Sequence, residues 1–332
     1  PASTDGDRLA SDRMHEYRVV FDDAAREVEV TARLAEGTQR VSAGDRAADS
    51  LRWMRACGTD KRPGRRRGSQ LRLFEGVDCV VYRAVVGNTE RRRFRVSLPD
   101  DVVRSSPRDW LWHPRLGTGE ELVIDLVLPE GIGASVPWLP RGDGRYRVPR
   151  SPGSSRPVAL FGAIERVDVP VAGAVLRVAM VGHDRREIVP WITTTAGDVA
   201  GVYGRFPNPS PQVVVLPSRP SGGHGVHFGH VIRDGGESVE FFVAPGKSAE
   251  VMAGDWTATH EFSHLMLPYV TAKWVSEGFA SYYQNVLLAR RGAYSEERAW
   301  TKLVTSFEKA KATPDPPPLD RLHTRSFRDT RM

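Results

Sequence analysis

The sequence has little cysteine, no long apolar run and no methionine at its start. Its two cysteines, Cys57 and Cys79, allow at most one disulfide bond, and their spacing leaves open whether they are bonded or are two buried free thiols. The most apolar stretch, from Val158 to Val181, is interrupted by four charged side chains. It cannot cross a bilayer as a helix, so we predict no membrane span.

Basic residues outnumber acidic ones and give the chain a net charge of +6, carried largely by arginine. Two clusters stand out, at residues 61–67 and 91–95. A nucleic-acid-binding protein combines clustered cations with aromatic stacking or a recognisable binding module, and the sequence shows no such module. We therefore interpret the clusters as solvated turns between strands and expect no nucleic-acid partner. A nucleic-acid binder whose affinity falls steeply with salt is the least favoured alternative.

Short alternating segments punctuated by glycine and proline occupy the chain from Glu16 to about Ala172, a pattern typical of β-strands. The predicted strands are residues 17–21, 28–32, 70–74, 79–85, 94–98, 122–128, 146–148 and 158–161. A chain of 332 residues with 40% hydrophobic content is expected to hold two domains. The predicted fold class is α+β. Residues 1–172 form an amino-terminal all-β domain of sandwich or saddle-like form, and residues 173–332 form a second domain.

The second domain begins with a predicted strand at residues 176–181 and a helix at 186–203, where apolar residues recur at helical spacing despite a proline and a glycine. A strand at 212–216 leads into a glycine-rich segment. Residues 225–232 and 238–243 then form a predicted hairpin that turns at Arg-Asp-Gly-Gly.

The strongest chemical signal is His-Glu-Phe-Ser-His at residues 260–264. His260 and His264 are four positions apart, so on a helix both imidazoles leave the same face and can hold one metal ion. Glu261 lies between them and can take a proton from a water on that metal. Asp255 can cap this helix, which we expect to end before Pro268.

A second helix is predicted from about Trp274 to Arg291, closed by Gly292. The connection of about eight residues can span about 25 Å when extended, so the second helix can return alongside the first. Glu277, early in that helix, would then reach the metal. The alternative is that the two histidines are ordinary polar residues on a surface helix and Glu277 is a carboxylate favoured by the helix dipole.

At these residues the chain resembles the gluzincin metallopeptidases, the aminopeptidase N and glycyl aminopeptidase families. Their pattern is His-Glu-x-x-His followed by a glutamate in Trp-x-x-Glu-Gly-Phe-Ala-x-Tyr, and the match covers roughly residues 155–293. The resemblance implies a thermolysin-like α+β catalytic domain that binds one Zn²⁺ through His260, His264 and Glu277, with Glu261 as general base. The implied function is hydrolysis of peptide bonds in peptide or protein substrates. The alternative is a non-catalytic, zinc-containing binding module with the same fold.

The sequence departs from the family pattern around the substrate. Its spacer between His264 and Glu277 is shorter than in the usual aminopeptidase N members, which puts one side of the cleft in doubt. Aminopeptidases of the family place a glutamate for the substrate amine on the strand before the metal helix, and residues 222–229 contain none. His224, His227 and His230 could bind a second metal there, but we favour loop or substrate-facing roles.

The family resemblance also bears on the ends of the chain. Tyr282, Tyr283 and Tyr294 do not match the family's usual oxyanion donor, and after Lys311 the sequence becomes proline-rich where the family continues in helices. We therefore expect an incomplete catalytic domain. The resemblance, the absent initiating methionine and the possible disulfide together predict an extracytoplasmic protein, periplasmic or secreted. Nothing in the sequence indicates the oligomeric state.

Overall fold

The computed structural model describes residues 13–87, 98–150, 156–218 and 225–311. The second arginine cluster, almost all of the predicted strand at 94–98, His224 and the proline-rich segment lie outside the described residues. The chain forms two compact units. Unit 1 comprises the described residues up to 166 together with 232–238, and unit 2 comprises those of 167–231 and 239–311. This division falls after Arg166, whereas the domain boundary predicted from the sequence lies at residue 172.

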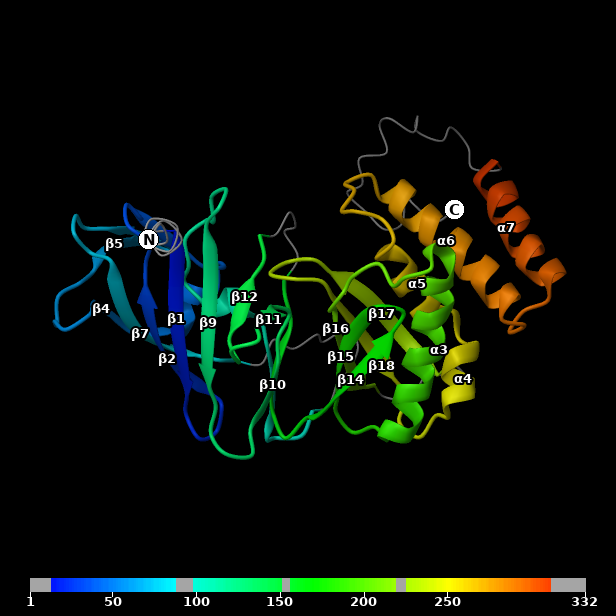
Figure 1. Cartoon of the computed structure of the whole chain (residues 1–332), viewed down its shortest axis with the longest axis horizontal. Helices are drawn as coiled ribbons and strands as arrows, with labels where there is room; N and C mark the ends of the chain where they lie inside the picture. Colours follow the sequence, from blue (N-terminus) through cyan, green and yellow to red (C-terminus); the bar gives the residue numbers. More distant parts are fainter. Residues whose placement is uncertain (1–12, 88–97, 151–155, 219–224, 312–332) are drawn as a thin grey trace, which may run out of the picture. The chain divides into compact units, whose positions relative to one another are not determined.

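Unit 1 is built almost entirely from β-strands, as predicted (Figure 1). Its largest sheet has the strand order β11-β12-β9-β1-β2-β7-β4, in which β1 and β9 are parallel and the other neighbours antiparallel. The strands are β1 (Met14–Phe21), β2 (Glu27–Arg33), β4 (Leu51–Ala56), β7 (Cys79–Val85), β9 (Glu121–Val127), β11 (Leu139–Pro140) and β12 (Tyr146–Val148).

The described residues of unit 1 also form two three-stranded sheets and two short helices. One sheet has the order β3 (Arg40–Ser42), β6 (Gln70–Leu73) and β5 (Gly64–Arg67), and the other has the order β10 (Gly133–Ser135), β13 (Ala159–Gly162) and β8 (Val102–Ser105). The helices are α2 (Ala47–Ser50) and the 3₁₀ helix η2 (Pro107–Asp109). The interpretation of residues 61–67 as turns was wrong in part. Arg65, Arg66 and Arg67 lie on strand β5, paired with β6, with their side chains exposed.

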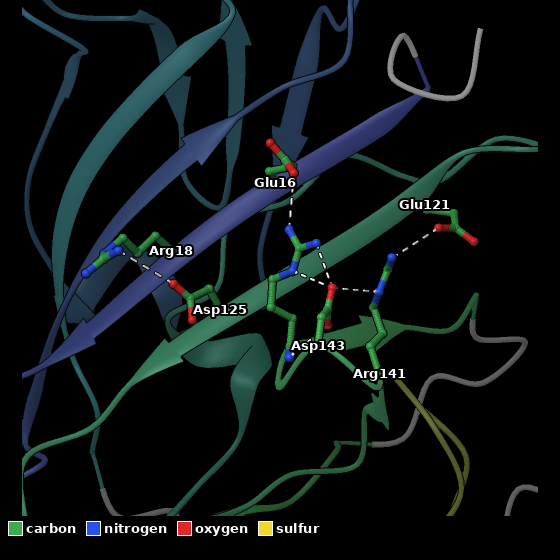
Figure 2. Close-up of polar contacts among 7 residues, drawn as sticks. Glu16, Arg18, Glu121, Asp125, Arg141 and Asp143 are labelled. Atoms are coloured by element: carbon green, nitrogen blue, oxygen red, sulfur yellow. Dashed lines mark hydrogen bonds and ion pairs between the residues drawn. The ribbon is translucent and has the colours of Figure 1, made fainter. Parts of the chain in front are cut away.

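The alternation of side chains along β1 shows how unit 1 separates its core from its charges. Tyr17, Val19 and Phe21 are buried, and the residues between them are exposed. Phe21 packs against Trp110 and Phe161 in an aromatic core. The opposite face carries paired charges, in which Arg145 lies 3.3 Å from Glu16 (Figure 2). The other ion pairs on this face are Arg145–Asp143, Arg141–Asp143, Arg141–Glu121 and Arg18–Asp125.

A disulfide bond joins Cys57 to Cys79, so the two cysteines are not free thiols. It connects the residue after β4 to the first residue of β7, and the two strands are neighbours in the sheet. The Cα atoms are 5.4 Å apart, within the ordinary range for a disulfide.

Unit 2 combines one sheet with helices, which confirms the predicted α+β class. The sheet has the order β14-β15-β16-β18-β17, with β17 at an edge. Its strands are β14 (Glu165–Val171), β15 (Ala174–Met180), β16 (Gln212–Pro217), β18 (Ser238–Val243) and β17 (Val226–Ile232). The helices are α3 (Arg185–Tyr203), α4 (Ala249–Gly254), α5 (Trp256–His264), α6 (Lys273–Arg290) and α7 (Glu296–Lys311).

The helices of unit 2 lie on one side of its sheet in Figure 1, with α7 next to α6. Helix α3 begins at the cap Asp184, whose side chain accepts a hydrogen bond from the amide of Arg186 at 2.8 Å, and ends at Gly204 in the left-handed conformation. Its proline lies inside the helix without ending it. Among the described residues, no helix has the length and apolar character needed to cross a membrane.

Candidate metal centre

Helix α5 is fixed by a cap and by one aromatic side chain. Asp255 accepts a hydrogen bond from the amide of Thr257 at 2.9 Å, as the sequence predicts for an N-cap. Phe262 is fully buried, with its ring 5.5 Å from that of Phe241 on β18 and 5.7 Å from that of Phe206. Residues two positions away on a helix lie on nearly the opposite side, so burial of Phe262 directs His260 and His264 away from the sheet core.

Helix α6 brings Glu277 to these histidines. Helix α5 ends at His264, and α6 starts at Lys273 and packs along it, so the predicted return of the second helix is correct. The Oε2 atom of Glu277 lies 3.3 Å from Nε2 of His260 and 3.7 Å from Nε2 of His264. The two Nε2 atoms are 3.2 Å apart.

These three separations fit zinc. A tetrahedral zinc ion with ligand bonds of about 2.0–2.1 Å requires its ligand atoms to be about 3.3–3.4 Å from one another. Two imidazoles and one carboxylate also form a donor set that zinc prefers, and three protein ligands leave the fourth position open. His260, His264 and Glu277 are therefore the residues that would hold the ion.

The outer nitrogens of both imidazoles are held by hydrogen bonds. Nδ1 of His260 lies 3.0 Å from Oε1 of Gln284, an oxygen that can only accept, so this nitrogen carries the proton. Nδ1 of His264 lies 3.0 Å from the hydroxyl of Ser276, which can accept in the same way. In the neutral imidazoles, protons on the Nδ1 atoms leave both Nε2 lone pairs directed toward Glu277, as metal binding requires.

Burial and mutual charge set the protonation of this group. Burial lowers the pKa of His260, but its hydrogen bond to Glu277 and the charge of Glu261 outweigh this effect and raise the pKa. Burial by itself would raise the pKa of Glu277. The hydrogen bond from His260 and the charge of His264 outweigh burial, so this pKa is lowered. Glu277 is therefore ionised at neutral pH and available as a ligand.

Glu261 lies beside the same group. It is 8% exposed, and its carboxylate and the two histidines offer ligand atoms within 4.8 Å of one another. Burial, together with the charge of Glu277, raises the pKa of Glu261 to about 7, against the opposing charge of His260. Hydrogen bonding from the backbone of Val231 on β17 acts the other way, to lower this pKa. A carboxylate with this pKa can both take and return a proton near neutral pH.

The other candidate residues have partners elsewhere. His227 lies 2.7 Å from the hydroxyl of Ser218, and His230 lies 3.6 Å from the buried carboxylate of Glu240. In the part of the chain that is described, neither belongs to a group of three potential metal ligands. Tyr294 lies beneath Arg298 and Lys302.

The partners that orient the centre were not predicted from the sequence. Gln284 is seven residues after Glu277, two turns along the same face of α6, so helical spacing could have identified it. Ser276 directly precedes Glu277 in the quoted motif. Val231 comes from β17 and carried no signal in the sequence.

The chain is similar to known proteins in one segment of its sequence and in its fold. A family profile described as M61 glycyl aminopeptidase matches residues 257–320. No curated protein sequence matches the chain.

Solved structures share the fold. An aminopeptidase N family protein from Idiomarina loihiensis superposes with a TM-score of 0.61 and 13% identity over 86% of this chain. An M1 zinc metallopeptidase from Deinococcus radiodurans, crystallised with a Tyr-Ser-Ala substrate, gives a TM-score of 0.52 and 13% identity over 92% of this chain. The chain spans 56% of the first protein and 76% of the second. The resemblance to gluzincin aminopeptidases is thus confirmed, at the level of the fold and of the short profile match.

Proposed function

We propose that this chain is a zinc-dependent peptidase. The observation that carries the proposal is the convergence of two Nε2 lone pairs and one ionised carboxylate at 3.2–3.7 Å, the spacing of a tetrahedral zinc site. His260, His264 and Glu277 are the metal ligands in this proposal, and Glu261 is the general base. The family match and the fold of the structural neighbours support a peptidase class.

Zinc held by His260, His264 and Glu277 would supply a water of lowered pKa and a Lewis acid for the carbonyl of a peptide bond. Glu261 accepts the proton of the attacking water and transfers it to the departing nitrogen. Its placement suits both steps, because it is buried next to the ligand atoms and its pKa is raised to about 7. Gln284 and Ser276 lie within hydrogen-bonding distance of the Nδ1 atoms, so in the neutral imidazoles the proton stays on Nδ1 and away from the ligand nitrogen.

Strand β17 is the proposed site for the backbone of the substrate. It is an edge strand, so its outer amide and carbonyl groups can pair with an extended peptide without reading its side chains. The predicted hairpin of β17 and β18 is confirmed, with left-handed Gly235 and Gly236 in the turn. We propose peptides or proteins as substrates on this basis.

Metal analysis combined with Glu261→Gln tests the proposal. The substitution preserves the shape of the side chain but removes the base, so hydrolysis of a peptide library should fall by about 10²–10⁴-fold while the zinc content stays at one ion per chain. Zinc retention without hydrolysis by the unsubstituted protein would instead support a non-catalytic, zinc-containing binding module.

We also propose an extracytoplasmic location. The Cys57–Cys79 disulfide supports it, because such bonds persist mainly in oxidising compartments. Cell fractionation with thiol labelling tests this point. Labelling of both cysteines in protein isolated without reductant would contradict it.

A further inference from the structure

Gly229 lies in the middle of edge strand β17, where the chain has no conformational need for glycine. The residue is buried, and it is not among the residues with positive φ. Any amino acid could adopt its backbone conformation, and glycine in a strand interior costs stability. The reason for glycine must therefore lie in the space around its missing side chain.

That space is occupied by Glu261. A Cβ atom at position 229 would lie 2.6 Å from Cγ of Glu261 and 3.0 Å from Cδ1 and Cε1 of Phe241. Phe241 cannot readily move, because its ring packs against Trp191 at 5.2 Å and Phe262 at 5.5 Å in the core of unit 2. Any side chain at position 229 would therefore displace Glu261.

The same strand also acts on the carboxylate of Glu261. Two residues beyond Gly229, hydrogen bonding from the backbone of Val231 lowers the pKa of this carboxylate, against the larger upward effect of burial. A backbone amide within a strand has a fixed direction, unlike a flexible side-chain donor. Gly229 thus allows the stem of Glu261 to approach β17, and Val231 fixes the end of the side chain.

We propose that Gly229 and the amide of Val231 act together as a positioning device for Glu261, so that the substrate-binding strand itself sets the place of the general base. The inference rests on the proposed peptidase function. Gly229 and Val231 are positioning residues, since they act through Glu261. Misplacement of a reacting group by about 1 Å can reduce a rate by about 100-fold.

Gly229→Ala is the principal test, and Gly254→Ala is its matched control. Gly254 is an exposed helix residue in the same unit, with open space where the Cβ would be added. For Gly229→Ala we expect unchanged zinc content, a kcat lowered by about 100-fold and a KM within about twofold of the unsubstituted value. Gly254→Ala should match the unsubstituted protein in all three.

Hydrogen exchange at the amide of Val231 provides a readout that does not depend on activity. Glu261→Ala removes the acceptor, so exchange at this amide should accelerate while neighbouring strand amides keep their rates. Gly229→Ala should accelerate the same amide. If Gly229→Ala does not fold, the exchange result with Glu261→Ala decides whether Val231 holds the carboxylate.

The outcomes separate the positioning inference from the proposed function. Unchanged kcat in folded Gly229→Ala, or unchanged Val231 exchange in Glu261→Ala, would overturn the inference. Loss of zinc together with kcat would also overturn it, because Gly229 would then support the whole centre. Faster Val231 exchange in both variants of a protein that hydrolyses no peptide would uphold the positioning of Glu261 and reject the peptidase.

Discussion

Two regions of this protein hold a basic side chain and a carboxylate at the same distance, with different consequences. On the outer face of unit 1, Arg145 and Glu16 lie 3.3 Å apart with side chains 37% and 51% exposed. In unit 2, His260 and Glu277 also lie 3.3 Å apart, but their side chains are 10% and 24% exposed. Water screens the first pair, which is expected to contribute no more than about 1 kcal/mol. The second pair is poorly screened, so its protonation and its partners matter far more.

Glu277→Gln should have the largest effect. It keeps the shape of the side chain but removes the charge that faces the two Nε2 atoms. Loss of a hydrogen-bond partner of a metal ligand typically lowers metal affinity by about 10–100-fold, so loss of the ligand charge itself should lower zinc affinity by more than about 100-fold. Competition with a chromogenic chelator measures it. Glu16→Gln makes the same change on the exposed face and should leave zinc affinity unchanged. Equal affinities in both variants would remove Glu277 from the ligand set.

The metal-free protein should lose stability as pH rises from about 4.5 to about 7. The folded-state pKa of Glu261 is raised by burial to about 7, so the folded protein retains a proton that the unfolded chain releases near its ordinary value of 4.5. The full effect is on the order of 3 kcal/mol, at about 1.4 kcal/mol per pKa unit. Urea unfolding as a function of pH, in chelator, measures it. Glu261→Gln should flatten this part of the profile, and an unchanged slope would assign it to other groups.

Gln284→Leu should weaken zinc binding by about 10–100-fold, because Nδ1 of His260 loses its acceptor and the imidazole can take the wrong tautomer. Gln284→Glu restores an acceptor and should bind zinc at least as well as the unsubstituted protein. Chelator competition again gives the measurement. Weak binding in both variants would point to a packing defect of α6 instead.

Arg145→Ala should have the smallest effect. The ion pairs on the face of β1 and β9 are exposed, so the free energy of unfolding should fall by less than about 1 kcal/mol, with a smaller change at high salt (Figure 2). Denaturant unfolding at two salt concentrations checks this expectation. A loss of several kcal/mol would mean that the charged face is a cooperative network, and the contrast with the metal centre would then fail.

The sequence predicted the elements whose signals are local. Alternating residues indicated strands β1, β2, β7 and β9, and the side chain of Asp255 indicated the start of α5. The spacing of His260 and His264 placed them on one helix face, and the motif around Glu277 supplied the third group. These features depend on how side-chain direction repeats along a helix or a strand, and this repeat is visible within a short segment of sequence. The short strands β3, β8 and β10 went unpredicted, because they depend on pairing with distant partners. Strands β5 and β11 pair with the next strand along the chain, but they are only four and two residues long and were not predicted either.

By itself, the sequence determined the kind of chemistry this protein can carry, since residue type and helical spacing fix which donor atoms share one face. Only the tertiary structure decided how that chemistry is arranged. The disulfide depends on β4 and β7 being neighbours in one sheet. The orientation of His260 on α5 depends on Gln284 of α6. The position of Glu261 depends on a glycine 32 positions earlier in the chain. Each is a contact between segments remote in sequence, and such contacts follow from packing around a common core.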